Sequence, residues 1–178
     1  MSISAADVVA RAGHVLFGQP LVTNTVRGVL VEAMVAQVLE PDWRWCAADF
    51  ASWDFENGPV RLEIKQSAPL QSWNKTSGRT SSCSFDIAYR SQAWENDVWV
   101  KGRKRAAHLY VFAHHPVTGE EADHREPSQW VFYVVPTTSL PDSSRISLGK
   151  AQQLSEAFGL GQLPGAIAAV AAIKPPAA

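Results

Sequence analysis

The run WDFENGPVRLEIKQS, residues 53–67, holds the most informative pattern in this chain of 178 residues. Its Asn57-Gly58 dipeptide favours a tight turn, so the residues on either side are expected to pair as the two strands of a β-hairpin. Glu63 and Lys65 lie two residues apart on the second strand, and their side chains therefore leave the same face. The pattern thus predicts an acid and a base side by side on one surface of a sheet.

A second carboxylate precedes the turn. Asp54 lies nine residues before Glu63, and the hairpin can bring both acids and the Lys65 ammonium into one small volume. Mg²⁺ prefers hard oxygen ligands and keeps several of its waters, so these two carboxylates and the carbonyl of Ile64 would suffice to bind it. Lys65 would neutralise charge on phosphoryl oxygens or orient the attacking water. This equipment is typical of metal-dependent cleavage of phosphodiester bonds.

Two plainer alternatives stay open for the same residues. Glu63 and Lys65 also fit an exposed ion pair on an amphipathic strand, which is common in proteins. Asp49 is a rival for the first metal ligand, although it lies fourteen residues before Glu63 and suits a tight hairpin less well than Asp54.

Glu32 adds a third acid, on a helix expected over residues 25–39. The residues three and four positions away from it are apolar or small, namely Gly28, Val29, Val35 and Ala36. Burial of a carboxylate costs several kcal/mol unless the group is paired or bound to a metal. Glu32 therefore indicates either a cation site beneath the hairpin or a structural ion pair with an arginine such as Arg61.

Glu32 on a helix, then Asp54, then Glu63-Ile64-Lys65 in a hairpin resembles the PD-(D/E)XK phosphodiesterase superfamily, which has the restriction-endonuclease-like fold. Longer strings resemble a bacterial group of unassigned function with that fold. They are WDFENGPVRLEIKQSAPLQSW (53–73), FDIAYR (85–90), AAHLYVFAHH (106–115), ADHREPSQWVFYVV (122–135) and SLGKAQQLSEAFGL (147–160). The resemblance covers residues 24 to about 160.

This resemblance implies an α/β fold with a central mixed β-sheet flanked by helices. It implies that Asp54 and Glu63 are metal ligands, that Lys65 is the catalytic lysine and that Glu32 is an accessory acid. Trp53 stands where the superfamily usually has a proline, a departure that is common within it.

Basic residues are concentrated beside the candidate site. Residues 61–105 carry nine basic and four acidic side chains, whereas residues 1–60 carry three and seven. A phosphate backbone would dock against such a basic segment. The candidate nucleic-acid contacts are Gln66, Gln71, Trp73, Arg79, Arg90, Lys101, Arg103, Lys104 and Arg105. The alternative is that Trp73 packs, that the neighbouring amides cap a turn and that residues 101–105 form a solvated loop.

The length favours one domain over residues 1–178. It comprises an N-terminal helix within 1–20, a core over 21–160 and a C-terminal helix and tail over 161–178. Strands are expected at 43–47, 50–55, 60–66, 108–114 and 129–135, and helices at 4–16, 25–39, 147–158 and 164–173. Residues 67–105 are expected to be a loop-rich excursion with one short strand at 85–88.

Composition excludes several other classes of protein. Cys46 and Cys83 form neither a disulfide framework nor a four-ligand zinc pattern, and they suit a reducing cytoplasm. Adjacent histidines on a strand point to opposite faces, which argues against zinc. The first residues show no basic region followed by an apolar core, so export is not expected, and the apolar C-terminal segment is too short and too rich in proline to cross a bilayer.

The sequence therefore predicts a cytoplasmic nuclease that uses Mg²⁺ or Mn²⁺ to hydrolyse phosphodiester bonds, with DNA as the expected partner. The main alternative is a catalytically silent module that keeps the nuclease-like fold to bind nucleic acid or protein. Assembly as a homodimer, or as a subunit of a larger complex, is compatible with the near-neutral net charge of −1.

Overall fold

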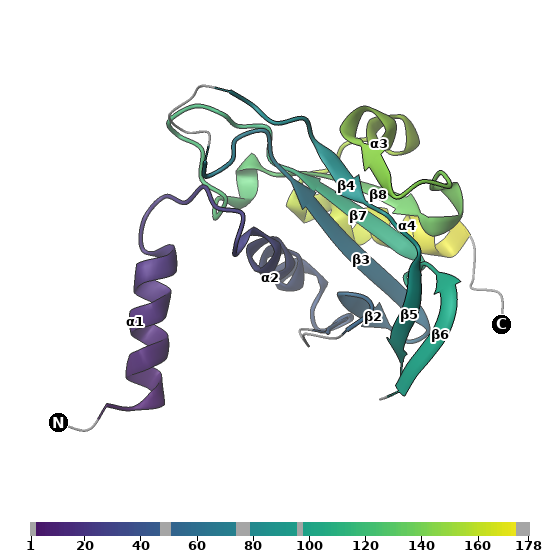
Figure 1. Ribbon diagram of the computed structural model, residues 1–178, viewed down its shortest axis with the longest axis horizontal. Coiled ribbons are helices and arrows are strands. Elements are labelled where there is room, and N and C mark those ends of the chain that lie inside the picture. Colours follow the sequence, from purple (N-terminus) through teal and green to yellow (C-terminus); the bar gives the residue numbers. More distant parts are fainter. Residues whose placement is uncertain (1–2, 47–50, 74–78, 96–97, 174–178) are drawn as a thin grey trace.

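The computed structural model describes residues 3–46, 51–73, 79–95 and 98–173 (Figure 1). The helices are α1 (Ala5–Phe17), α2 (Arg27–Leu39), α3 (Leu148–Leu154) and α4 (Leu163–Ile173). The strands are β1 (Arg44–Trp45), β2 (Phe55–Asn57), β3 (Val60–Ser67), β4 (Ser84–Asp86), β5 (Arg90–Glu95), β6 (Val98–Lys104), β7 (Leu109–His114), β8 (Val131–Pro136) and β9 (Arg145–Ser147). Short 3-10 turns lie at Pro127–Gln129, Thr137–Ser139 and Leu160–Gln162.

A five-stranded mixed sheet organises the fold, with the strand order β1-β2-β3-β7-β8. Strands β3 and β7 are parallel, and the other neighbouring pairs are antiparallel. Two small two-stranded sheets, β4-β9 and β5-β6, accompany it. The expected α/β class with a central mixed sheet flanked by helices is therefore confirmed.

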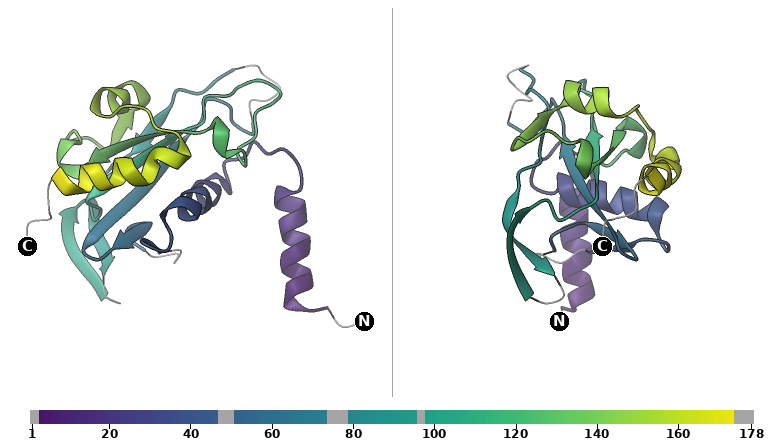
Figure 2. Two further views of the ribbon diagram at one scale, coloured as in Figure 1. Left: turned by 180° about the vertical axis from the view of Figure 1, so that it is seen from behind. Right: turned by 90° about the vertical axis from the view of Figure 1, so that its right-hand side faces the viewer.

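Both faces of the central sheet are covered, because residues of β7 and β8 alternate between two apolar cores. One core joins Leu109, Val111, Phe132 and Val134 to helices α2 and α4, which lie on the same side of the sheet (Figure 2). The other joins Tyr110, Phe112, Tyr133 and Val135 to β4, β9 and α3. Strand β7 is consequently apolar on both faces and buried throughout, apart from half-buried His114 at its end.

The predicted hairpin forms, with a shifted first strand. β2 pairs with β3 through Phe55↔Leu62, Glu56↔Arg61 and Asn57↔Val60. The two-residue turn is therefore Gly58-Pro59, and Gly58 has a positive φ of 53°. Of the strand expected at 50–55, residue 50 lies outside the described residues, and the strand itself begins at Phe55, whose side chain is fully buried.

Residues 67–105 contain more strand than the sequence indicated. Besides β4, the segment forms the β5-β6 hairpin, paired from Arg90↔Lys104 to Glu95↔Val98. The described side chains of β6 are exposed or half-buried, so this hairpin shows no apolar alternation by which a strand is recognised. The expectation of a loop-rich excursion was wrong here for that reason.

Helix α3 is shorter than the predicted 147–158. It ends at Leu154, and Phe158 instead pairs antiparallel with Phe132 through two backbone hydrogen bonds of 2.9 Å. Tertiary pairing at the edge of the sheet thus overrides the local helical pattern.

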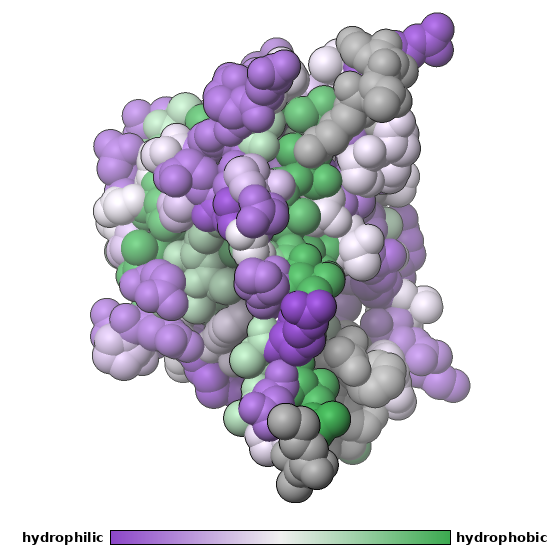
Figure 3. Space-filling model, turned by 90° about the vertical axis from the view of Figure 1, so that its left-hand side faces the viewer, coloured by the Kyte–Doolittle hydropathy of each residue, from purple (hydrophilic) through white to green (hydrophobic). Residues whose placement is uncertain are grey.

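Helix α1 projects from the body of the molecule (Figure 1). A capping box closes its first turn, since Ser4 Oγ accepts from Asp7 N–H at 3.2 Å and Asp7 Oδ2 accepts from Ser4 N–H at 2.9 Å. None of its residues is buried, and apolar side chains are visible along this side of the molecule (Figure 3). Among the described residues, no helix has the length and apolar character needed to cross a membrane.

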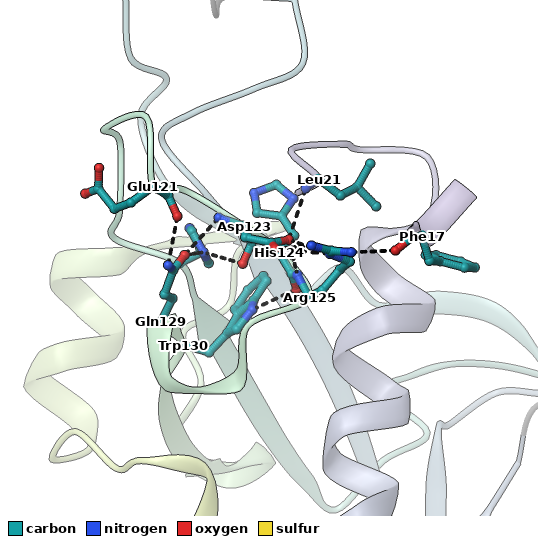
Figure 4. Close-up of polar contacts among 9 residues, drawn as sticks. Phe17, Leu21, Glu121, Asp123, His124, Arg125, Gln129 and Trp130 are labelled. Atoms are coloured by element: carbon teal, nitrogen blue, oxygen red, sulfur yellow. Dashed lines mark hydrogen bonds and ion pairs between the residues drawn. The ribbon is translucent and has the colours of Figure 1, made fainter. Parts of the chain in front are cut away.

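A polar cluster ties the end of α1 and the chain after it to the loop before β8 (Figure 4). Arg125 Nη1 donates to the carbonyl of Phe17, and Asp123 Oδ1 accepts from Leu21 N–H at 3.0 Å. The His124 N–H donates to the Leu21 carbonyl at 2.7 Å. We call residues 123–125 the N-terminal clamp.

Candidate functional site

The predicted acids lie around the open edge of β3: Glu32 and Asp54 line one cavity there, Glu63 lines a second, and Lys65 lines both. β2 pairs with residues 60–62 of β3 only, so the outer edge of β3 has no strand partner beyond Leu62 in the described part of the chain. Asp54 lies directly before β2 and reaches this edge, where its Oδ2 accepts the N–H of Ile64 at 2.6 Å. The Asp54 carboxylate is therefore fixed to the backbone of Ile64, the residue that lies between Glu63 and Lys65 in the sequence.

Glu63 and Lys65 form an ion pair between Oε1 and Nζ, as their spacing on one face of β3 predicts. The pair is not an exposed one, because the side chains are only 16% and 28% accessible. The alternative of a solvated surface pair therefore does not describe these residues.

Glu32 reaches the same region from α2. Its Oε2 accepts the indole N–H of Trp45 at 3.0 Å. The alternative of an ion pair between Glu32 and Arg61 does not form among the described residues, and the Arg61 guanidinium stacks 3.9 Å from the ring centre of Trp53. The hydrogen-bond donor to Glu32 is thus a neutral group. Among the described residues, no basic side chain forms an ion pair with this carboxylate.

The three acids raise one another's pKa values. Burial, and then the charge of Glu32, raise the pKa of Asp54 to about 6. Burial and the charge of Asp54 raise the pKa of Glu63 to about 7. Burial, with a smaller contribution from Glu63, also raises the pKa of Glu32. Lys65 is the cation paired with Glu63, and although burial opposes it, this ion pair leaves the pKa of Lys65 raised.

The donor set suits a hard divalent cation. Asp54, Glu32 and Glu63 each engage one carboxylate oxygen in the contacts above, and within the described residues no hydrogen bond occupies the other oxygen. Among the described residues, no group of three or more His, Cys, Asp or Glu side chains is arranged to hold a metal ion. Mg²⁺ does not need three protein ligands, because one or two carboxylates and waters satisfy it.

Two cavities flank the acids, with volumes of about 320 and 330 Å³. The first is lined by Glu63, Lys65, Arg90, Arg105 and Tyr110 among others. The second is lined by Glu32, Asp54, Ile64, Lys65, Gln66 and Arg145 among others. Lys65 and Asp86 line both, so Lys65 is reached from two sides.

Three residues of the site lay outside the sequence prediction. Asp86 on β4 accepts from Arg90 at 2.6 Å and acts electrostatically on Lys65. Tyr110 is the register partner of Glu63 across the parallel β3-β7 pair, and burial and the charge of Glu63 raise its pKa. Arg145 comes from β9. These residues are distant from the hairpin in sequence, and only the topology identifies them.

The predicted nucleic-acid contacts separate into groups. Gln66, Arg90 and Arg105 line the cavities. Gln71 is buried, and its amide donates to the Ala68 carbonyl at 2.5 Å. Trp73 is 70% exposed, so the alternative in which it packs is wrong.

The remaining predicted contacts line neither cavity. Arg103 stacks on Tyr89 at 4.2 Å and lies 3.7 Å from Asp142. Lys101 and Lys104 lie on β6, and Arg79 is exposed. Asp49, the rival first ligand, lies outside the described residues.

No protein-family model matches this chain, and no curated protein matches it in sequence. The solved structure of a bacterial homing endonuclease, I-Ssp6803I, is similar, with a TM-score of 0.44 and 16% identity. The similarity covers 86% of this chain and 99% of that one.

Proposed function

We propose that this protein is a Mg²⁺- or Mn²⁺-dependent nuclease that hydrolyses phosphodiester bonds, with DNA as its first candidate substrate. One observation carries the proposal: Glu32, Asp54 and Glu63 lie around Lys65 at an open strand edge, and burial, together with the charge of a neighbouring acid, raises the pKa of each of the three. Perturbed acids that line a cavity mark functional sites more often than structural ones.

Each residue has a defined task in this proposal. Asp54 and Glu63, supported by Glu32 and the Ile64 carbonyl, would hold the cation. A bound divalent cation polarises the scissile phosphate and stabilises the charge that develops on it. Lys65, which lines both cavities, would donate hydrogen bonds to the phosphoryl oxygens. The bond from Ile64 N–H to Asp54 would keep the carboxylate oriented, because a backbone donor cannot rotate away.

The test is cleavage of plasmid and single-stranded DNA with Mg²⁺, Mn²⁺ or chelator. Glu63→Gln and Lys65→Ala are each expected to lower the rate by at least about 100-fold, since electrostatic groups of this kind contribute that much. Glu40→Gln removes an exposed carboxylate beyond the end of α2 and serves as the control. Activity that survives both site substitutions, or that persists in chelator, would contradict the proposal.

A second candidate function is a silent module that binds nucleic acid without cleaving it. The finding that no three His, Cys, Asp or Glu side chains among the described residues are arranged to hold a metal ion favours it. This candidate predicts salt-sensitive DNA binding by the wild type and no cleavage with any divalent cation. It also predicts that Lys65→Ala lowers the DNA affinity only by the contribution of one lost positive charge.

A further inference from the structure

The cavity at the open edge of β3 contains two groups that a cation site does not require. Gln66 and Arg145 line it together with Glu32, Asp54 and Lys65. A guanidinium carries only donors and cannot ligate a metal. The cavity therefore offers hydrogen-bond donors and positive charge beside the acids, which suits an anion next to a cation.

A buried arginine fixes the orientation of Gln66. Arg27, the first residue of α2, is 7% exposed, and its Nε donates to Gln66 Oε1. Because the guanidinium can only donate, Gln66 must turn its carbonyl oxygen toward Arg27 and leave its NH₂ group for the cavity. Gln66 thus presents a donor of fixed polarity at the cavity wall.

The charge of Arg27 is met by neutral groups alone. Nη1 donates to Asn24 Oδ1 at 3.2 Å and to Gln71 Oε1 at 3.3 Å, and no described carboxylate pairs with the side chain. Amide oxygens satisfy the N–H groups without cancelling the charge, so Arg27 keeps a positive potential behind Gln66.

Arg145 is likewise without a carboxylate partner among the described residues. Its Nε and Nη2 donate to Ser84 Oγ at 3.1 and 2.7 Å, and Nη2 lies 3.5 Å from the Ser84 carbonyl. Asp86 is opposite Arg145 in the β4-β9 register, but its carboxylate accepts from Arg90. The Ser84 contacts hold the Arg145 guanidinium at the cavity while its charge stays available.

We propose that this cavity binds a backbone phosphate of nucleic acid adjacent to the one that is cut. Arg145 and the Gln66 NH₂ group are the direct donors, and Arg27 is a positioning residue that acts through Gln66. The inference rests on the proposed function, which assigns the scissile phosphate to Lys65 and the acids. It assigns affinity to this cavity without assigning sequence preference, because phosphate contacts carry no base information.

The first test measures binding of the full chain to a labelled oligonucleotide in chelator, by fluorescence anisotropy over a range of salt concentrations. Arg145→Gln is expected to lower the affinity about tenfold at low salt and to reduce the log–log salt slope by about 0.7–0.9, the value for one lost phosphate contact. Arg44→Gln is the matched control, because Arg44 is exposed and paired with Glu56 outside both cavities. It is expected to leave the slope unchanged.

The second test separates donation by Gln66 from support of the fold. Gln66→Glu keeps the acceptor for Arg27 but replaces the NH₂ donor with an anionic oxygen, so the variant is expected to fold at the wild-type melting temperature or above. Its oligonucleotide affinity is expected to fall at least tenfold. Asn24→Asp adds the same charge against the same guanidinium, and Asn24 does not line the cavity. It is expected to bind within about twofold of the wild type.

The outcomes distinguish this inference from the proposed function. An unchanged salt slope in Arg145→Gln, or equal binding by Gln66→Glu and Asn24→Asp, overturns the phosphate subsite even if the wild type cleaves DNA. A wild type that binds but never cleaves, with the slope reduced in Arg145→Gln, keeps the subsite and removes the nuclease. A wild type that binds no nucleic acid in any buffer overturns both.

Discussion

At the scale of single residues, the buried acids of the site lower the stability of the cation-free protein. Asp54 and Glu63 have pKa values raised to about 6 and about 7. A raised pKa in the folded state means that stability is greatest below the ordinary pKa of the acid and is lost as the pH rises through the raised value. Above pH 7 the ionised, buried acids therefore lower the free energy of unfolding, a loss of stability that is common at functional sites.

Asp54→Asn is expected to stabilise the cation-free protein at pH 8 by roughly 1–3 kcal/mol, since one pKa unit corresponds to about 1.4 kcal/mol. The amide oxygen can still accept the Ile64 N–H, so the local geometry is kept. Urea unfolding in chelator measures the effect, with Asp142→Asn as an exposed control. The same substitution is expected to abolish cleavage, and a destabilised Asp54→Asn would contradict the account of the site.

Binding of Mg²⁺ or Mn²⁺ is expected to raise the melting temperature more as the pH rises from 5 to 8. The carboxylates must lose their protons to bind metal, and the pKa values of about 6 and about 7 place the change within that window. At a cation concentration 100 times the dissociation constant, the stabilisation is about 2.7 kcal/mol. A thermal shift of equal size at pH 5 and pH 8, or one retained in Glu63→Gln, would show binding elsewhere.

At the scale of elements, the hairpin was predictable because its signals are local. Asn57-Gly58, the alternation along β3 and the pair Glu63 and Lys65 all lie within one short run. The β5-β6 hairpin was not predictable, since its described side chains show no apolar face. Asp86 and Arg145 enter the site only because β4 and β9 pair across sixty intervening residues, a long-range contact without a local signature.

Gly58→Ala is expected to destabilise the protein by about 1–2 kcal/mol. Gly58 has a φ of 53°, and a β-carbon there is strained even though it would meet no neighbouring atom. Gly149→Ala in α3 meets open space at ordinary helical geometry, and it is expected to be neutral or stabilising by up to about 1 kcal/mol. Equal effects of the two substitutions in chemical unfolding would argue against the turn described here.

At the scale of the whole molecule, the N-terminal segment and the body are joined through buried histidines. His115 and His124 are fully buried, with ring centres 4.8 Å apart, and both also contact the ring of Trp130. His124 Nδ1 accepts the Thr23 N–H at 3.2 Å. His124 Nε2 and His115 Nδ1 have no hydrogen-bond partner in the described structure. The sequence did not indicate this contact between His115 and His124, because it depends on how the loop before β8 folds back.

Acid is expected to weaken this junction. Burial, and then the neighbouring His115, lower the pKa of His124 to about 4. A lowered pKa means that the stabilisation is complete above the ordinary value near 6.5 and is lost as the pH falls from there toward 4. Unfolding followed from pH 7 to pH 4 should show this slope in the double variant Asp54→Asn with Glu63→Gln, where the opposing titrations of both acids are removed. His124→Asn should flatten it, and a slope unchanged by His124→Asn would assign it to other groups.

The N-terminal clamp has a mechanical consequence. Asp123, His124 and Arg125 are consecutive, and they hold Leu21, Thr23 and the end of α1 by separate bonds. Anchors on adjacent residues share one stretch of backbone, so they cannot fray one after another as the last turns of a helix do. The N-terminal segment is therefore attached in an all-or-none manner. A change that unfolds the loop at residues 123–125 releases the whole segment at once, and a change that leaves this loop folded leaves the segment attached.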